Sequence, residues 1–380
     1  MKKFIPPLQN INWSINSKEK IDFNISYTQS ILADNNIIDS LSSTGRVFLF
    51  IDENIGKIYR KEIENIVIKS RKKYYLHFVK PDEENKNLNS VVKIIEFIDA
   101  QKLSRLSEPL ITIGGGVVLD IVSFAASIYR RGVPIIKIPT NLLSIVDACV
   151  GVKTGINFGL MRNRIGTYYP PKKVLIDKNF LKTCPNRHIS NGLGEIFKIA
   201  LIKSSDLFND LESYAFNIGI KEKLCYGALA SKIINQSISL MLEELEPNLF
   251  EKNLERCVDF GHSISPIIEL KNVDTLLHGE AVTLDCLFFS CLSYKKGFLQ
   301  LEDLKKVYSL VREINLPIFH KDFTNKELIY ENLEQTKAHR NGNLNLPIPN
   351  KIGSHLFLNE IKENEINESI EIFSEFYKEI

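Results

Sequence analysis

The stretch from Ile111 to Lys153 reads ITIGGGVVLDIVSFAASIYRRGVPIIKIPTNLLSIVDACVGVK, and it decides the fold that we predict. A β-branched run ends in three glycines, an apolar segment with helical spacing follows, and Pro134–Pro139 predicts the next strand. Strand, glycine turn, helix and strand form a βαβ unit, whose glycines let backbone N–H groups approach a phosphate at the helix N-terminus. The spacing is not G-x-G-x-x-G, so a turn that only packs a helix on a sheet remains an alternative at this point.

The composition is that of an ordinary globular chain and excludes several classes of protein. The 380 residues allow two domains, with 44% apolar residues, 25% charged residues and a formal net charge of +2. Without a basic stripe, this charge argues against a nucleic-acid binder. No apolar run approaches the roughly 20 residues of a membrane helix, and MKKFIPP is not a secretory signal. Six scattered cysteines without a C-x-x-C pair favour reduced thiols in a cytoplasmic protein.

Charged residues follow two other predicted strands in the first half. Val47–Ile51 predicts a buried strand with Asp52 at its carboxyl end. An acidic side chain there either takes a ribose hydroxyl or caps the next helix, and both alternatives stay open. Tyr74–Val79 predicts another strand, and the polar loop after it carries Glu83 and Lys86. Taken alone, these two residues read as surface charges.

The segment KTGINFGLMRNRIGTYYPPKKVLID, which begins at Lys153, predicts a long functional loop. It is rich in glycine, asparagine and basic residues, and Arg162, Asn163 and Arg164 suit a phosphate together with Lys153. Val174–Asp177 predicts a last strand.

From residue 191 the pattern becomes helical. The helices that we predict include Gly192–Ile202, Lys221–Glu244, Ser263–Leu270, Glu280–Lys295 and Leu301–Ile314. The predicted fold class is therefore α/β over residues 1–188 followed by a helical domain over residues 189–380. The cleft between the two is the default site for a small ligand.

Three residues of the helical half have the chemistry of a metal site. Glu195 lies in NGLGEIFK, His262 in DFGHSISP and His278 in LLHGEAV. Two histidines and a carboxylate with an open coordination position make a catalytic zinc set. The spacing is not H-E-x-x-H, so the ligands must come from separate helices, and each histidine alone also fits a structural role.

The chain resembles the sugar phosphate cyclases, the superfamily of 3-dehydroquinate synthase. The shared motifs, in the family's order from about Asp52 to Pro349, are GGGVVLD, RRGVPIIKIPT, VDACVGVKTGIN, NRIGTYYPP, GLGEIFK, FGH and LHGEAV. The resemblance implies a Rossmann-like NAD-binding domain and an all-helical domain that binds a divalent metal, zinc or cobalt. It also implies a homodimer and a phosphate-eliminating lyase that acts on a sugar phosphate.

The resemblance assigns roles to the residues at matching positions. The expected metal ligands are Glu195, His262 and His278. The expected catalytic residues are Asp147, Lys153, Lys198 and Asn163. The expected NAD-binding residues are Asp52, Asn54, Glu83, Lys86, Gly114, Gly115, Gly116, Asp120, Thr140, Asp147 and Lys153. The expected substrate-binding residues are Lys86, Arg131, Arg162, Leu245, Arg256, Asp259, Pro266, Lys337 and His339. Arg131 is expected to bind the substrate phosphate, either in its own subunit or in the site of the partner subunit.

Departures from the dehydroquinate synthase pattern indicate a branch of the superfamily. That pattern has a lysine in the segment before the first metal histidine, where this chain has LEELEPNL with Leu245. It has asparagine and a second histidine where this chain has Asp259 and Pro266. These changes disfavour a substrate carboxylate, because an anion beside Asp259 is repelled and lacks a charge-assisted partner.

Leu245, Asp259 and His339 together are similar to the pattern of 2-epi-5-epi-valiolone synthases. Desmethyl-4-deoxygadusol synthases are expected to carry Glu, Ala and Thr there. The resemblance thus implies cyclisation of sedoheptulose 7-phosphate to 2-epi-5-epi-valiolone. The alternatives are a desmethyl-4-deoxygadusol, 2-epi-valiolone or 3-dehydroquinate synthase, and a metal-dependent polyol dehydrogenase of the glycerol dehydrogenase type.

Overall fold

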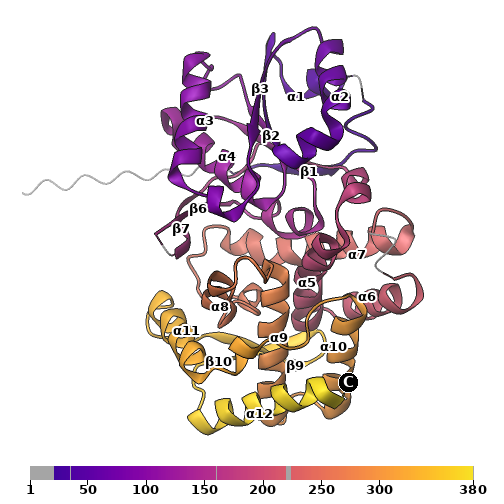
Figure 1. The fold of residues 1–380 in the computed structure, drawn as a ribbon, viewed down its shortest axis with the longest axis vertical. Helices are drawn as coiled ribbons and strands as arrows, with labels where there is room; N and C mark the ends of the chain where they lie inside the picture. The colour runs from indigo at the N-terminus through magenta and orange to yellow at the C-terminus, as the bar shows by residue number, and fades with distance from the viewer. Residues whose placement is uncertain (1–20, 35, 160, 220–223, 380) are drawn as a thin grey trace, which may run out of the picture.

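A computed structural model describes residues 21–34, 36–159, 161–219 and 224–379. The first half of the chain forms an α/β lobe, and the second half forms a helical lobe that lies against one end of it (Figure 1). The two lobes are joined by the segment before helix α5 (Asn186–Lys203), and α5 itself enters the centre of the helical lobe.

The α/β lobe is built on a six-stranded parallel sheet in the order β1-β8-β5-β4-β2-β3. Its strands are β1 (Asn24–Tyr27), β2 (Arg46–Asp52), β3 (Lys73–Val79), β4 (Leu110–Gly114), β5 (Ile135–Pro139) and β8 (Lys173–Ile176). The strands predicted from the β-branched runs are therefore confirmed. A parallel sheet is covered on both faces, which is why its strands read as continuous apolar runs.

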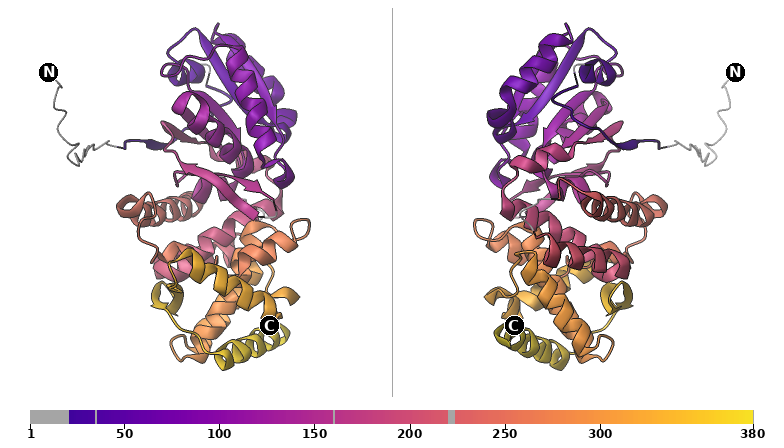
Figure 2. Two further views of the ribbon diagram at one scale, coloured as in Figure 1. Left: turned by 90° about the vertical axis from the view of Figure 1, so that its left-hand side faces the viewer. Right: turned by 90° about the vertical axis from the view of Figure 1, so that its right-hand side faces the viewer.

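Alternate side chains of the central strands enter two separate cores. Phe48 and Phe50 of β2 pack on the side of helices α3 (Leu88–Ala100) and α4 (Gly116–Ile128). Leu49 and Ile51 pack on the opposite side, against helix α2 (Glu53–Lys69). The period of two along a strand explains this division. Figures 1 and 2 show these helices on the two faces of the sheet.

The segment that we predicted as a long loop is a β-hairpin, so that prediction was wrong. Strands β6 (Lys153–Phe158) and β7 (Met161–Tyr168) pair antiparallel, with Gly155 opposite Gly166. A Cβ atom on Gly166 would lie 2.0 Å from the carbonyl oxygen of Thr154, so glycine permits the close pairing. Ile156 of the hairpin enters the core on the α4 side. The local sequence is polar and rich in glycine, so it does not show that Ile156 packs against residues elsewhere in the chain.

The second half is helical around the buried helix α9 (His278–Lys295), which passes through the middle of the lobe in Figure 1. The other helices are α6 (Ser205–Asn217), α7 (Ala228–Leu245), α8 (Ser265–Lys271), α10 (Leu301–Glu313), α11 (Lys326–His339) and α12 (Glu363–Glu379). The helix predicted from Lys221 begins seven residues later, after Gly227, whose φ of +85° is not helical. Residues 221–223 of that prediction lie outside the described residues.

The helical lobe also holds one hairpin, which corrects the expectation of an all-helical domain. Strands β9 (Leu346–Lys351) and β10 (Ser354–Leu358) pair antiparallel. Pro347 and Pro349 obscured β9 in the sequence, because proline usually argues against a strand. A two-stranded hairpin has edges on both sides, where proline is tolerated.

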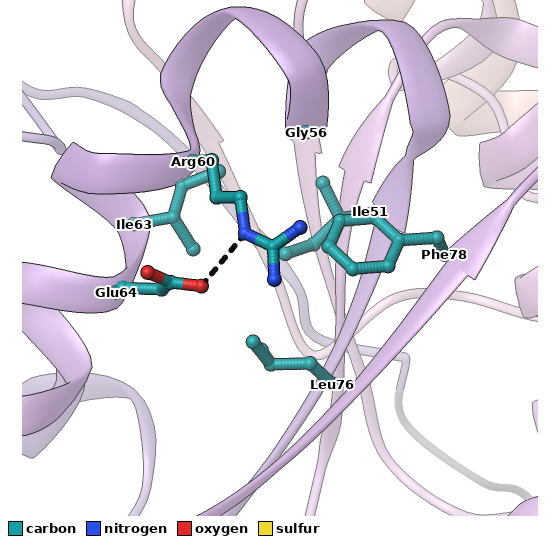
Figure 3. Close-up of a pocket in the computed structure, with 7 residues that line it drawn as sticks. All are labelled: Ile51, Gly56, Arg60, Ile63, Glu64, Leu76 and Phe78. Carbon is teal, nitrogen blue, oxygen red and sulfur yellow. Dashed lines mark hydrogen bonds and ion pairs between the residues drawn. The ribbon is translucent and has the colours of Figure 1, made fainter.

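No helix in the described ranges is long and apolar enough to cross a membrane. A small hollow between α2 and the sheet, shown in Figure 3, is lined by Ile51, Gly56, Arg60, Ile63, Glu64, Leu76 and Phe78. Its only polar contact in Figure 3 is the ion pair from Arg60 Nε to Glu64 Oε1 at 2.9 Å, which faces solvent. We assign no function to this hollow.

Candidate metal and cofactor site

The glycine turn lies at the carboxyl end of β4 and opens α4. Gly115 is the residue before the helix, and a Cβ atom there would lie 2.6 Å from Asn141 Nδ2. A Cβ atom on Gly114 would lie 3.0 Å from Asp52 Cβ, so Asp52 stands beside the turn. The first N–H groups of α4 have no acceptor within the helix, which makes this end of α4 suited to bind a phosphate.

Asp52 caps the helix that follows it, which was one of the two alternatives from the sequence. Its Oδ1 accepts from the backbone N–H of Asn54 at 2.8 Å and of Ile55 at 3.3 Å. Burial raises the pKa of Asp52, and these backbone N–H groups and that of Gly115 oppose the rise. The contact of Asp52 with a ribose stays a prediction, and so does the binding of NAD by Asn54.

Four predicted residues from three elements meet at Lys86. Lys86 Nζ lies 2.7 Å from Asp120 Oδ2 and donates to Asn163 Oδ1 at 2.6 Å. The backbone N–H of Asn163 donates to Asn157 Oδ1 at 2.9 Å, and Asn157 Nδ2 donates to Glu83 Oε1 at 2.8 Å. Sequence reasoning missed Asn157, although it ends the family motif VGVKTGIN. The cluster ties the hairpin to the predicted NAD-binding residues.

The three predicted metal ligands converge on one point. His278 Nε2 lies 3.3 Å and His262 Nε2 lies 3.8 Å from Glu195 Oε1. One ligand atom from each residue lies within 4.8 Å of the others. Glu195 is in the middle of α5, His278 begins α9, and His262 lies in the loop before α8. The prediction of separate helices holds for Glu195 and His278, whereas His262 lies in a loop.

Each imidazole is held by its other nitrogen. His262 Nδ1 lies 3.1 Å from the carbonyl oxygen of Phe260, and His278 Nδ1 lies 3.1 Å from Glu269 Oε2. Since a carbonyl oxygen and a carboxylate only accept, each Nδ1 is the donor. A neutral ring then presents the lone pair of Nε2 toward Glu195, as a metal ligand must.

The residues fit a divalent metal. Glu195 Oε1 is buried, and the Nε2 atoms of His278 and His262 face it. When both rings are neutral, this oxygen has no donor and is suited to share a cation with the two nitrogens. Two Nε2 atoms and one carboxylate oxygen are a set that zinc prefers, and three ligands leave a position for a substrate oxygen.

The electrostatics of the triad are set by its neighbours. Burial and the charge of Lys198 together lower the pKa of His262 to about 4, against the opposing effect of Glu195. Burial also acts to lower the pKa of His278, but Glu269 and Glu195 outweigh it and raise that pKa to about 10. A metal that binds here must displace the His278 proton, because only the neutral ring is a ligand.

Two predicted catalytic residues border the triad. Lys198 is buried, lies 2.6 Å from Glu195 Oε2 and donates to the carbonyl oxygen of Val258 at 3.1 Å. Asp147 lies in a turn next to the glycine turn, since a Cβ atom on Gly116 would be 3.7 Å from Ala148 Cβ. Burial raises the pKa of Asp147 and the charge of Glu195 adds to the rise. Asp147 thus links the cofactor side to the metal side.

An alternating row of charges lies beside the site. Lys153 Nζ pairs with Glu251, which also pairs with Arg256 Nη1. Arg256 Nη2 lies 2.7 Å from Asp259 Oδ1, and Arg340 Nη2 donates to Asp259 Oδ2 at 2.9 Å. Neither Glu251 nor Arg340 could be predicted from the sequence, because no local pattern marks them.

The row corrects the role that we expected for Asp259. From the sequence we expected Asp259 to be a free anion that repels a substrate carboxylate. Burial acts to raise the pKa of Asp259, but Arg256 and Arg340 outweigh it and lower that pKa. A carboxylate held between two guanidinium groups neither repels strongly nor has all its lone pairs available. Asp259 therefore orients Arg256.

The remaining predicted substrate residues are more dispersed. Leu245 and Arg256 line a cavity of about 220 Å³ between the end of α7 and the following loop. Arg131, Pro266 and His339 are exposed, and Lys337 pairs with Glu334 at 2.7 Å. Thr140 is buried after β5 and donates its backbone N–H to the carbonyl of Gly114 at 3.1 Å. Arg162 faces Glu269 and Glu83 instead of an open phosphate site.

The loop that carries His262 is held by a residue that the sequence did not reveal. Asp285 Oδ2 accepts from the backbone N–H groups of Ser263 at 3.0 Å, Ile264 at 2.6 Å and Ser265 at 2.8 Å. Asp285 is fully buried in α9. Burial raises its pKa to about 7 although the three N–H groups act to lower it. It is the anchor between α9 and the metal-binding loop.

Replacing Asp285 by alanine is expected to lower the free energy of unfolding by about 3 kcal/mol, because three buried N–H groups lose their acceptor. The native pKa near 7 exceeds the ordinary value of 3.8, so the native state holds more protons between these pH values. Stability from this group is therefore present below pH 4 and lost as pH rises through 7. Denaturant unfolding from pH 5 to 8 should show this slope in the unmodified protein and not in Asp285→Asn. An unchanged slope in that variant would contradict the assignment.

Comparison with known proteins agrees with this geometry. Two family models match, 3-dehydroquinate synthase N-terminal over residues 76–191 and 3-dehydroquinate synthase C-terminal over residues 192–338. A 2-epi-5-epi-valiolone synthase of Actinomyces sp is 37% identical over 374 residues, which are 96% of this chain and 98% of the relative. A 3-dehydroquinate synthase of Campylobacter concisus is 32% identical over 89% of this chain and 94% of the relative.

A solved structure is similar over the whole fold. It is the 2-epi-5-epi-valiolone synthase of Streptomyces hygroscopicus subsp. jinggangensis, with NAD+ and Zn2+ bound. It superposes with a TM-score of 0.92 at 35% identity and covers 96% of this chain and 100% of that chain. Identity at this level over both lobes, with the glycine turn and the Glu-His-His triad in place, shows that the chain belongs to the 3-dehydroquinate synthase-like sugar phosphate cyclases.

Proposed function

We propose that the protein converts sedoheptulose 7-phosphate to 2-epi-5-epi-valiolone and inorganic phosphate, with NAD and a divalent metal, zinc or cobalt, as cofactors. The observation that carries the proposal is the joint position of the triad, Lys198 and Asp147 beside the glycine turn. The similarity to 2-epi-5-epi-valiolone synthases over nearly the full length supports the choice of substrate.

The overall reaction needs no external redox partner. The C5 hydroxyl is oxidised, phosphate is eliminated across C6 and C7, C5 is reduced, and the opened chain closes by attack of C7 on the C2 ketone. When bound, NAD accepts and returns the two electrons, and the metal acidifies the hydroxyl that is oxidised. The products contain all atoms of the substrate, with phosphate as the leaving group.

The residues of the chain orient the substrate and hold protons in this scheme. Lys198 stays charged, because Glu195 and Asp147 outweigh the burial that acts to lower its pKa. Its ammonium group is suited to stabilise negative charge on a substrate oxygen. Lys86 fixes the side chain of Asn163 through their 2.6 Å hydrogen bond, and we expect both residues to contact the substrate. The leaving phosphate remains a candidate base for the C6 proton, so we assign no residue to that step.

The substrate end distinguishes this reaction from that of dehydroquinate synthases. Leu245 lines the cavity beside Arg256, and Asp259 balances the charge of that arginine. An arginine that is already paired is a weaker partner for a substrate carboxylate, because a new anion has to compete with Asp259 and Glu251. A terminal hydroxymethyl group next to Leu245 carries no such requirement.

Incubation with sedoheptulose 7-phosphate, zinc and NAD is expected to release one phosphate per cyclised product, with no accumulated NADH. NMR of the product distinguishes 2-epi-5-epi-valiolone from 2-epi-valiolone and desmethyl-4-deoxygadusol. The seven-carbon acid phosphate used by dehydroquinate synthase should turn over at least about 100-fold more slowly, because its carboxylate would have to compete with Asp259 and Glu251 for Arg256. Leu245→Lys with Asp259→Asn should begin to admit that acid, and Asp259→Asn alone should weaken the sugar reaction.

Two results would count against the proposal. Comparable phosphate release from the acid and the sugar would place the chain with the dehydroquinate synthases. Stoichiometric NADH without phosphate release would indicate a polyol dehydrogenase.

We also propose a homodimer in the cytoplasm, in which Arg131 reaches the phosphate of a neighbouring site, since Arg131 is exposed in the single chain.

A further inference from the structure

Glu269 connects a metal ligand to an arginine of the other lobe. Its Oε2 accepts from His278 Nδ1 at 3.1 Å, and its Oε1 pairs with Arg162 Nη1. The carboxylate is only 4% exposed, at the end of the short helix α8. Burial acts to raise its pKa, but His278 and Arg162 outweigh it and lower that pKa to about 2. Both oxygens of Glu269 are therefore in use, and neither faces a substrate.

Arg162 reaches this carboxylate from the α/β lobe. It lies on β7, and its Nε is 3.6 Å from Glu83 Oε1. Glu83 is held in turn by Asn157 at 2.8 Å. The guanidinium group thus stands between a carboxylate of the predicted NAD side and a carboxylate of the metal side. Its fork can face two acids at once, which a lysine ammonium on a single stem does less well.

The consequence for the metal follows from the hydrogen bond at Nδ1. A histidine ligand that donates to a carboxylate has a fixed tautomer and ring orientation, and its Nε2 becomes a stronger donor to the metal. Glu269 can do this only while its own rotamer is held, and Arg162 is the group that holds it. Loss of either should loosen His278 without removing a ligand.

We propose that Glu269 and Arg162 form a positioning pair that orients His278 for the metal and couples the triad to the α/β lobe. This proposal rests on the proposed function only in requiring that the triad binds a divalent metal. It replaces the expectation that Arg162 binds the substrate phosphate, because the side chain is already engaged with Glu269.

The experiment measures zinc affinity by competition with a chromogenic chelator, in metal-free full-length protein at one pH. Glu269→Gln keeps the size of the side chain and loses its charge, and it should weaken zinc binding about 10- to 100-fold. Arg162→Lys keeps the charge and loses the fork, and it should weaken binding about tenfold by the same route. The double variant should be no weaker than Glu269→Gln alone, because both act through one histidine.

A matched control and a second measurement separate positioning from general damage. Lys271→Gln removes an exposed charge from the same helix, two residues from Glu269, and should leave zinc affinity unchanged. The cobalt-loaded Glu269→Gln protein should show a shifted visible spectrum at full occupancy, and Glu269→Asp should restore part of the unmodified spectrum.

The outcomes are distinct. If the unmodified protein binds no zinc, the proposed metal centre fails and this pair fails with it. If it binds zinc and Glu269→Gln binds equally well with an unchanged cobalt spectrum, the pair is overturned while the proposed function stands. If Arg162→Lys raises only the KM for sedoheptulose 7-phosphate, Arg162 is a substrate contact and its assignment to the pair is wrong.

Discussion

Replacing His278 by alanine is expected to abolish cyclisation, with a loss of at least about 1000-fold in turnover. The metal contributes several kcal/mol to stabilising charge in the reaction, and each 1.36 kcal/mol is a factor of ten. The variant retains Glu195 and His262, whose nearest ligand atoms are 3.8 Å apart, but two ligands hold zinc poorly. Removal of His278 also leaves Glu269 with only Arg162 as its partner among the contacts described here.

The measurements are bound zinc after gel filtration, phosphate release and NAD affinity by calorimetry. The variant should lose zinc and phosphate release while NAD affinity changes little, because the glycine turn belongs to the other lobe. His188→Ala is the matched control, since His188 is an exposed histidine on α5, the helix of Glu195. A metal-free His278→Ala protein with normal turnover would disprove the role of the triad.

Replacing Gly115 by valine is expected to weaken NAD binding by about 100-fold or more. Any Cβ atom at this position lies 2.6 Å from Asn141 Nδ2, and the side-chain amide of Asn141 is held because its Oδ1 accepts from the N–H of Ser144 at 2.9 Å. The larger side chain also occupies the space through which a pyrophosphate approaches the N–H groups of α4. Hydrogen bonds to a charged group contribute about 1.5–3 kcal/mol each, so the loss of one or two gives this factor.

Calorimetric titration with NAD measures the effect directly. Gly45→Val is the matched control, because a Cβ atom at Gly45 meets nothing within 4 Å. Zinc binding by the triad should persist in Gly115→Val, which shows that the helical lobe is folded. An NAD affinity equal to that of the unmodified protein would mean that the dinucleotide does not lie on this turn.

The sequence by itself determined the parts of the protein that depend on local pattern. The βαβ unit around the three glycines could be predicted, because apolar periodicity and glycine are local signals. For Asp52 the sequence offered a helix cap and a ribose contact as equal alternatives, and the structure showed the cap. The triad of Glu195, His262 and His278 could be proposed because the donor set is chemically distinctive and the ordered motifs resemble one family.

Only the tertiary structure decided which charges neutralise one another. Asp259 is paired because Arg340, 81 residues later, donates to it. Asp285 anchors the His262 loop from another helix, at a sequence separation of about twenty residues. The strands β6 and β7 form a hairpin that is stabilised because Ile156 packs in the core on the α4 side. Such contacts join residues whose separation along the chain carries no periodic signal, so pattern analysis cannot detect them.

The pair of Arg162 and Glu269 shows the same limit at the centre of the function. The two residues are 107 positions apart and belong to different lobes. From the sequence we predicted that Arg162 binds a phosphate, because a basic residue in a glycine-rich segment can pair with several kinds of anion. In the folded protein its partner is Glu269, since a buried carboxylate must be paired within the protein. The sequence thus determined the chemistry that is available, and the fold determined its partners.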